Sequence, residues 1–156
     1  MRGLVGFAVV FVVGCVPRPS EPPDDPWAGP PVVSNPPHPG CQSDASCASG
    51  QVCARTGACL APDQVRAIHV SWTVSGMPAS STSCASAPDL QIELDSTSGS
   101  GHLAYLPLPC VEGRFSVDKA PISIDKVSLG RAYGGSGWQS AKIDPVTGEA
   151  SLDLPY

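Results

Sequence analysis

The stretch Val65-Arg-Ala-Ile-His-Val-Ser-Trp-Thr-Val74 decides the fold of this chain. Apolar side chains occupy every second position from Ile68 to Val74, and small or polar residues stand between them. This period of two predicts a β-strand with one face buried and the other facing solvent. No stretch of ten or more residues shows helical periodicity with caps, so the sequence predicts an all-β protein.

Residues 61–156 contain further strand signals separated by turn residues. Apolar runs predict strands at 90–94, 103–108, 113–117, 122–133, 138–143 and Glu149–Leu154. Pro145 and Gly148 predict a turn over 144–148 that would join the last two strands as a hairpin. Six to eight short strands in about 95 residues are typical of a two-sheet antiparallel β-sandwich.

Two cysteines fall within this predicted sandwich. Cys84 precedes the strand at 90–94, and Cys110 follows the strand at 103–108. We expect them to form a disulfide, which closes a loop of about 26 residues. A loop of that length corresponds to roughly 3.5 kcal/mol of stabilisation by the chain-entropy estimate.

Residues 41–60 contain Cys41, Cys47, Cys53 and Cys59, and five residues separate each cysteine from the next. A segment of about 20 residues buries too little apolar surface to fold without disulfides or a metal. Zinc ligands usually come as pairs two to four residues apart, so the spacing favours disulfides over a four-cysteine zinc site. Four cysteines allow three connectivities, and the sequence does not choose between them. We lean towards Cys41–Cys53 with Cys47–Cys59.

Residues 16–40 form a predicted linker. Ten of these 25 residues are proline, which lacks a backbone donor and has a fixed φ. Such a segment samples extended polyproline II conformations and is expected to be a disordered, stiff spacer. The expected organisation is therefore a leader at 1–14, a tether at 15–40, a disulfide module at 41–60 and a β-sandwich at 61–156.

The amino terminus has the features of an export signal. Arg2 precedes an uncharged apolar run at 4–13, which is too short to span a bilayer as a helix but fits a signal-peptide core. The tetrapeptide Val12-Val13-Gly14-Cys15 resembles the lipobox of bacterial lipoproteins. This resemblance implies cleavage before Cys15 and lipidation of its sulfur. Val16, which is not aspartate, implies sorting to the outer membrane.

The alternatives for this segment are an uncleaved anchor and an ordinary cleaved signal. Cysteine arithmetic favours the lipoprotein: the chain has seven cysteines, and lipidation of Cys15 leaves six that can pair. The pattern C-x-x-D-x-x-C-x-x-G-x-x-C-x-x-x-G-x-C over 41–59, followed by the β-domain, is similar to uncharacterised myxobacterial-type lipoproteins. That resemblance implies no known activity.

The charge of the chain excludes some partners. Nine basic and 14 acidic residues leave a net charge of −5, and loss of Arg2 with the leader makes it −6. The sequence has no basic cluster, so we expect no nucleic-acid partner. The expected membrane contact is the lipid on Cys15.

Catalytic signals are missing from the sequence. His38, His69 and His102 are far apart in sequence, and no G-x-S-x-G nucleophile motif is present. We therefore expect no enzyme activity, no bound metal and no cofactor.

Three acidic residues lie on the predicted strand at 90–94 or directly beside its ends. Asp89, Glu93 and Asp95 could serve a calcium site or a glycosidase. Alternating charges are also expected on the exposed face of a strand, and we favour that interpretation.

The glycine-rich segment 130–138 is the best candidate for ligand binding. Arg131, Tyr133 and Trp138 could stack on a sugar or hold a peptide. The alternative is an ordinary loop in which Trp138 covers the edge of the sandwich. The expected function is that of a membrane-anchored surface or periplasmic lipoprotein with a structural or protein-interaction role. A carbohydrate- or peptidoglycan-fragment-binding module is the alternative.

Overall fold

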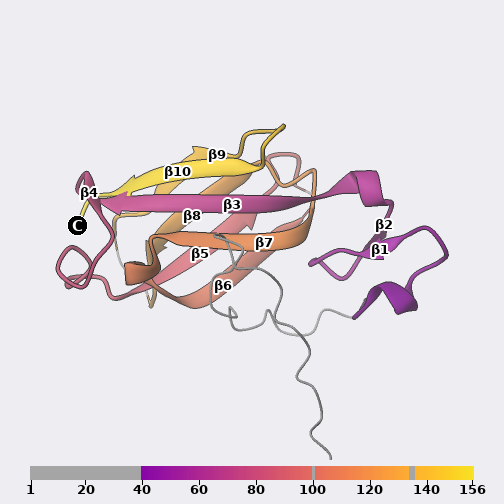
Figure 1. Ribbon diagram of the computed structural model, residues 1–156, viewed down its shortest axis with the longest axis horizontal. Coiled ribbons are helices and arrows are strands. Elements are labelled where there is room, and N and C mark those ends of the chain that lie inside the picture. Colours follow the sequence, from indigo (N-terminus) through magenta and orange to yellow (C-terminus); the bar gives the residue numbers. More distant parts are fainter. Residues whose placement is uncertain (1–39, 100, 134–135) are drawn as a thin grey trace, which may run out of the picture.

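The computed structural model describes residues 40–99, 101–133 and 136–156 (Figure 1). The predicted leader, Cys15 and the linker up to residue 39 lie outside the described residues. The described chain folds into two facing β-sheets with a small disulfide-bonded module at one end. None of the helices in this part of the chain has the length and apolarity needed to cross a membrane.

The first sheet is built around the predicted strand, β3 (Val65–Val74). On one side, β3 pairs in antiparallel fashion with two strands. Most of its length pairs with β7 (Arg114–Pro121), and its last two residues pair with β4 (Met77–Pro78). On the other side it pairs with β10 (Glu149–Leu154) in parallel. β3 is therefore the central strand, and its ten residues set the length of the sheet.

The period of two along β3 is confirmed. Ile68, Val70 and Val74 are fully buried, and Trp72 is almost so. The indole Nε1 of Trp72 donates a hydrogen bond of 2.9 Å to the backbone carbonyl of Cys110, which satisfies the one polar atom of this buried ring. Trp72 thereby links the first sheet to the segment that follows the second sheet's edge strand.

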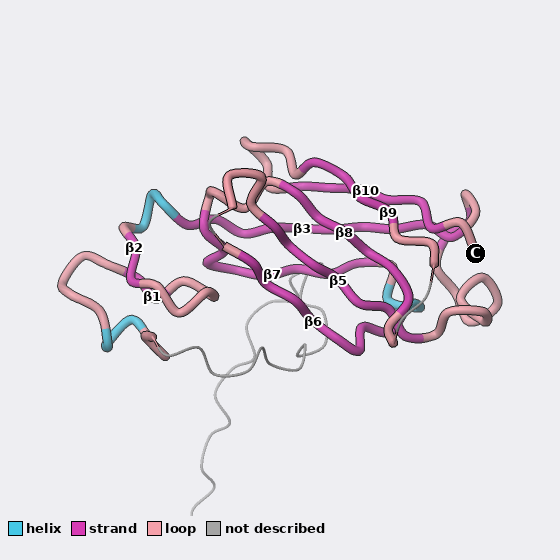
Figure 2. The backbone as a smooth tube through the Cα atoms, turned by 180° about the vertical axis from the view of Figure 1, so that it is seen from behind, coloured by secondary structure: helices cyan, strands magenta, loops and turns pink. Residues whose placement is uncertain are grey.

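The second sheet has the strand order β6-β5-β8-β9, all antiparallel. Its strands are β5 (Asp89–Asp95), β6 (His102–Pro109), β8 (Lys126–Arg131) and β9 (Gln139–Lys142). Strand β6 holds two prolines and lies at an edge, where a missing backbone donor costs no ladder hydrogen bond. Figure 2 shows the molecule from the side opposite to that of Figure 1, with the strands of this sheet labelled.

The core lies between the two sheets. Both contribute alternate apolar side chains, so the predicted two-sheet sandwich is confirmed. The rings of Tyr105 from β6 and Phe115 from β7 lie 5.0 Å apart and join the sheets on one side. The largest fully buried side chains are Ile68, Leu90, Ile92, Leu94, Leu103, Ile124, Leu129 and Leu154.

The predicted disulfide between Cys84 and Cys110 is present, with a Cα–Cα distance of 5.7 Å. Both cysteines are buried in the core, at 2% and 0% exposure. The bond ties the loop before β5 to the short 3-10 helix η3 (Cys110–Glu112) after β6. It therefore closes the same end of the sandwich as Trp72.

The predicted hairpin between the last two strands is wrong. The turn at 144–148 does form, but β9 pairs with β8 in the second sheet while β10 crosses to β3 in the first. The apolar residues of β10 are buried beside β3. A parallel partner some 80 residues earlier in sequence leaves no local signal, whereas a turn does.

Smaller differences concern strand boundaries. The strand expected at 122–133 begins at Lys126, because residues 122–125 turn back with Ile124 N–H bonded to the Pro121 carbonyl at 3.0 Å. The strand predicted at 103–108 begins one residue earlier, at His102, and ends at Pro109.

Gly148 permits the crossover between the sheets. It has φ +75°, and its carbonyl accepts a 2.9 Å hydrogen bond from the His69 N–H. A Cβ atom at this position would collide with the backbone carbonyl of Ala67. Gly76 has the similar φ of +73°, but a Cβ there would meet no atom within 4 Å.

We predict that Gly148→Ala destabilises the protein by at least about 1 kcal/mol more than Gly76→Ala. Both substitutions carry the cost of a positive φ, and Gly148→Ala adds a collision with backbone that cannot move without disturbing β3. Urea unfolding of the two variants measures the difference. Equal destabilisation would show that the close approach of the turn to β3 is absent.

Candidate functional site

The cysteine-rich module contains two disulfides, Cys41–Cys53 and Cys47–Cys59. The prediction of disulfides in place of a zinc site is thus confirmed. Of the three possible connectivities, the structure has the one favoured from the sequence. Each bond joins one strand of a two-stranded hairpin, β1 (Val52–Cys53) or β2 (Cys59–Leu60), to the segment that precedes the hairpin. This hairpin was not predicted, because two-residue strands leave no periodic pattern.

Backbone hydrogen bonds give the module its shape. Gly57 has φ +80° in the turn of the hairpin, and its carbonyl accepts a 2.9 Å bond from Cys41 N–H. The short 3-10 helix η1 (Asp44–Ser46) lies between the first two cysteines. The carboxylate of Asp44 accepts a 2.9 Å bond from Cys53 N–H.

Two ion pairs fasten the module to strand β7 of the sandwich. The Lys119 ammonium donates to both carboxylate oxygens of Asp44, at 2.9 and 2.8 Å. Arg55 pairs with Asp118, and its backbone N–H donates to the Lys119 carbonyl at 3.1 Å. The hydrogen bond from Lys119, followed by that from the Cys53 N–H, holds the pKa of Asp44 below its ordinary value.

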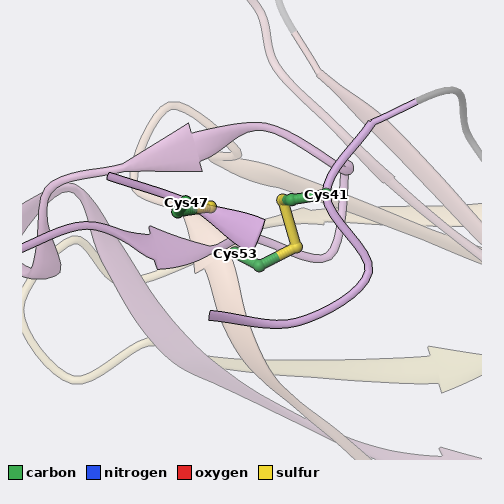
Figure 3. A group of neighbouring side chains, drawn as sticks. All are labelled: Cys41, Cys47 and Cys53. Atoms are coloured by element: carbon green, nitrogen blue, oxygen red, sulfur yellow. A yellow bond between two sulfur atoms is a disulfide. The ribbon is translucent and has the colours of Figure 1, made fainter. Parts of the chain in front are cut away.

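The sulfur atoms of the module are close together (Figure 3). The Sγ atoms of Cys41, Cys47 and Cys53 all lie within 4.8 Å of one another. In the oxidised protein these sulfurs are shared in disulfides and are not thiolates, which are the form that binds metals.

The described residues of the glycine-rich segment, 130–133 and 136–138, lie at the opposite end of the sandwich from the module, near the carboxyl terminus marked in Figure 1. Tyr133 is 77% exposed and has φ 63°, a left-handed conformation that is unusual for a bulky residue. Trp138 is 38% exposed, and its ring lies over Gly130, where a side chain would collide with it. Trp138 therefore covers part of the outer face of β8, whereas the alternative interpretation placed it over the edge of the sandwich.

Arg131 has a different environment. Its guanidinium carbon lies 4.5 Å from the centre of the Tyr156 ring, and the Tyr156 hydroxyl donates to the Gly137 carbonyl at 3.2 Å. Side chains alternate along β8, so Arg131 shares the core-facing side with Leu129, while Gly130 faces Trp138.

The three predicted ligand-binding residues therefore do not form one pocket. Arg131 and Trp138 lie on opposite faces of the same strand, and Tyr133 projects into solvent beyond the strand end. Sequence reasoning missed Tyr156, which lies after the last strand and carries no local signal of its contact with Arg131.

Of the histidines and acidic residues considered in the sequence, the fold brings His102 and Asp95 together. His102 Nδ1 lies 2.7 Å from Asp95 Oδ1 at the module end of the second sheet, and His69 lies half-buried on β3. His38 is outside the described residues. Asp89 and Asp95 begin and end β5, roughly 20 Å apart at strand rise.

Glu93 lies between those two aspartates on the same strand. Its carboxylate accepts a 2.8 Å bond from the Gln91 amide. The burial pattern places Asp89, Glu93 and Asp95 on the outer face of β5, as solvent-facing charges would be.

A shallow cavity of about 460 Å³ lies between the edge strands β9 and β10, around the turn at 144–148. Its lining includes Lys142, Asp144 and Glu149. Asp144 is occupied in the turn: hydrogen bonds from the Thr147 and Val146 N–H groups lower its pKa. The cavity thus has no convergent set of reactive side chains among the described residues.

Asp44 makes the attachment of the module sensitive to acid. A carboxyl whose pKa is lower in the folded state than in the unfolded state stabilises the folded protein at any pH above its unfolded pKa, which is near 3.8 for Asp44. This contribution is lost as the pH falls through the folded pKa. We predict that Asp44→Asn lowers the melting temperature at pH 7 and that the deficit shrinks below about pH 4. Asp63→Asn, at an exposed position in η2 (Pro62–Gln64), is the control. A deficit that is constant with pH would contradict the ion pair.

The geometry places a rigid, doubly cross-linked module at one end of a β-sandwich and an exposed aromatic loop at the other. Comparison with known proteins adds no family: no protein-family model, curated protein or solved structure matches the chain. The fold class and the disulfide framework are therefore the features from which a function has to be argued.

Proposed function

We propose that this chain is an exported lipoprotein, anchored in a membrane by lipid on Cys15, that presents a rigid body for interactions with other molecules. One observation carries the proposal: three disulfides account for six of the seven cysteines, and Cys15 remains. Disulfides persist in oxidising compartments outside the cytoplasm. The tetrapeptide at 12–15 supplies the matching signal for lipidation.

The arrangement of the described residues supports a display role. The described chain begins at Gly40, whose backbone lies against Gly57 in the hairpin of the module, so a tether that precedes it would join the body at the module. Met77, Tyr133 and Trp138 are exposed large side chains that lie on or near the loops of the far end. A body held by its module would present these residues away from the membrane.

The proposed location is the outer membrane, because Val16 follows the lipidated cysteine. The proposed role is structural or protein-binding and involves no catalysis. In support, the His102–Asp95 pair lies at exposed positions on two neighbouring strands, and the sequence has no G-x-S-x-G nucleophile motif.

A second candidate is binding of carbohydrate or peptidoglycan fragments through the loop 130–138. The observation that favours it is Tyr133, an exposed aromatic held in a conformation that such residues rarely adopt. Non-glycine residues with positive φ are frequent at ligand-binding sites. Glycan binding that disappears in Tyr133→Ala and survives Ile122→Ala, an exposed apolar residue at the other end, would favour this candidate.

Mass spectrometry of the protein isolated from its native membrane tests the main proposal. We predict an amino terminus at Cys15 that carries acyl chains on both its sulfur and its amino group. Cys15→Ser should leave the protein unacylated and release it from the membrane fraction. A membrane-bound product that retains Met1 and an unmodified Cys15 would refute the proposal.

A further inference from the structure

We propose that the module is also a redox-gated metal site, distinct from its role as part of a displayed body. When a dithiol reduces its two disulfides, four thiolates become available to bind one Zn²⁺ ion. The ligands are Cys41, Cys47, Cys53 and Cys59.

The sulfur positions suit a tetrahedral site. The Sγ atoms of Cys41, Cys47 and Cys53 lie within 4.8 Å of one another, and the Sγ of Cys59 is bonded to that of Cys47. Zinc–sulfur bonds of about 2.3 Å place the corners of a tetrahedron roughly 3.8 Å apart. Three of the four sulfurs thus already lie close together (Figure 3), and the disulfide to Cys47 holds the fourth, that of Cys59, beside them until reduction.

The fold overcomes the spacing that argued against zinc in the sequence. Metal ligands usually come as pairs two to four residues apart because a short turn then brings them together. Here the β1–β2 hairpin brings Cys53 opposite Cys59, so two ligands six positions apart become direct neighbours.

Hydrogen bonds that do not involve sulfur hold the cysteine backbones in place. The N–H of Cys41 donates to the Gly57 carbonyl at 2.9 Å, and that of Cys47 donates to the Asp44 carbonyl at 3.0 Å. The Cys53 N–H donates to the Asp44 carboxylate at 2.9 Å. None of these contacts uses a sulfur atom, so all of them can form again when a bound ion replaces the disulfides as the cross-link of the module.

Asp44 and Lys119 connect this framework to the sandwich. The ion pair between them holds the carboxylate that bonds Cys53, and β7 holds Lys119. Asp44 is thus a positioning residue: it does not bind the ion, but it orients a residue that does. Loss of such outer contacts typically weakens metal affinity about 10- to 100-fold.

Reduction of the module consumes one dithiol for each of its two disulfides. Each disulfide takes two electrons and two protons from one dithiol, which is itself oxidised to a disulfide. The four thiols then release their protons as the ion binds, so affinity rises with pH. All four module cysteines are half-buried, whereas Cys84 and Cys110 are fully buried, so the module disulfides are the ones open to a dithiol.

The test uses the full chain, reduced by a dithiol without oxygen and then freed of the reductant. Co²⁺ serves as a spectroscopic probe and is afterwards displaced by Zn²⁺. We expect one Co²⁺ per chain with thiolate-to-metal charge-transfer absorption, abolished by Zn²⁺ and lacking in the double variant Cys41→Ser, Cys53→Ser. The unreduced protein should give no such absorption.

A second comparison separates a built site from four unstructured thiols. Asp44→Asn should weaken Co²⁺ binding about 10-fold or more, while Asp63→Asn should leave it unchanged. Equal affinities in both variants, a stoichiometry other than one, or no charge-transfer band in the reduced protein would each overturn the proposal. None of these results depends on whether Cys15 carries lipid.

Discussion

Cysteine pairing is the constraint on which the rest of the structure depends. The module of 20 residues buries no apolar residue except Ala54, so its two disulfides replace the hydrophobic core that a larger unit would have. The third bond, Cys84–Cys110, lies inside the sandwich. The backbone carbonyl of Cys110 also accepts the hydrogen bond from the Trp72 indole. The same pairing leaves Cys15 as the remaining cysteine, so the framework and the proposed anchor rest on one set of facts.

Much of the fold followed from local sequence signals. The alternation from Ile68 to Val74 predicted the central strand, and the five-residue spacing of the module cysteines predicted disulfides. The exchange of β10 into the first sheet could not be predicted, because a turn at 144–148 looks the same whether the next strand stays in its sheet or leaves it. Gly148 shows the difference only once the Ala67 carbonyl is seen beside it.

The candidate loop shows where sequence reasoning ends. Composition picked out Arg131, Tyr133 and Trp138, but strand alternation places Arg131 and Trp138 on opposite faces of β8. Tyr156, which holds Arg131, lies beyond the last strand and could be found only in three dimensions. The module behaves in the opposite way: residues that a spacing rule counted against a metal site are brought together by a hairpin too short to predict.

Mapping of the disulfides in the unreduced, exported protein tests the central claim most directly. Proteolysis under conditions that prevent exchange, followed by mass spectrometry, should give the cross-linked pairs Cys41–Cys53, Cys47–Cys59 and Cys84–Cys110, with no free thiol among these six. Other pairs, or free thiols at 41–59, would contradict the framework from which both the module and the assignment of Cys15 are argued.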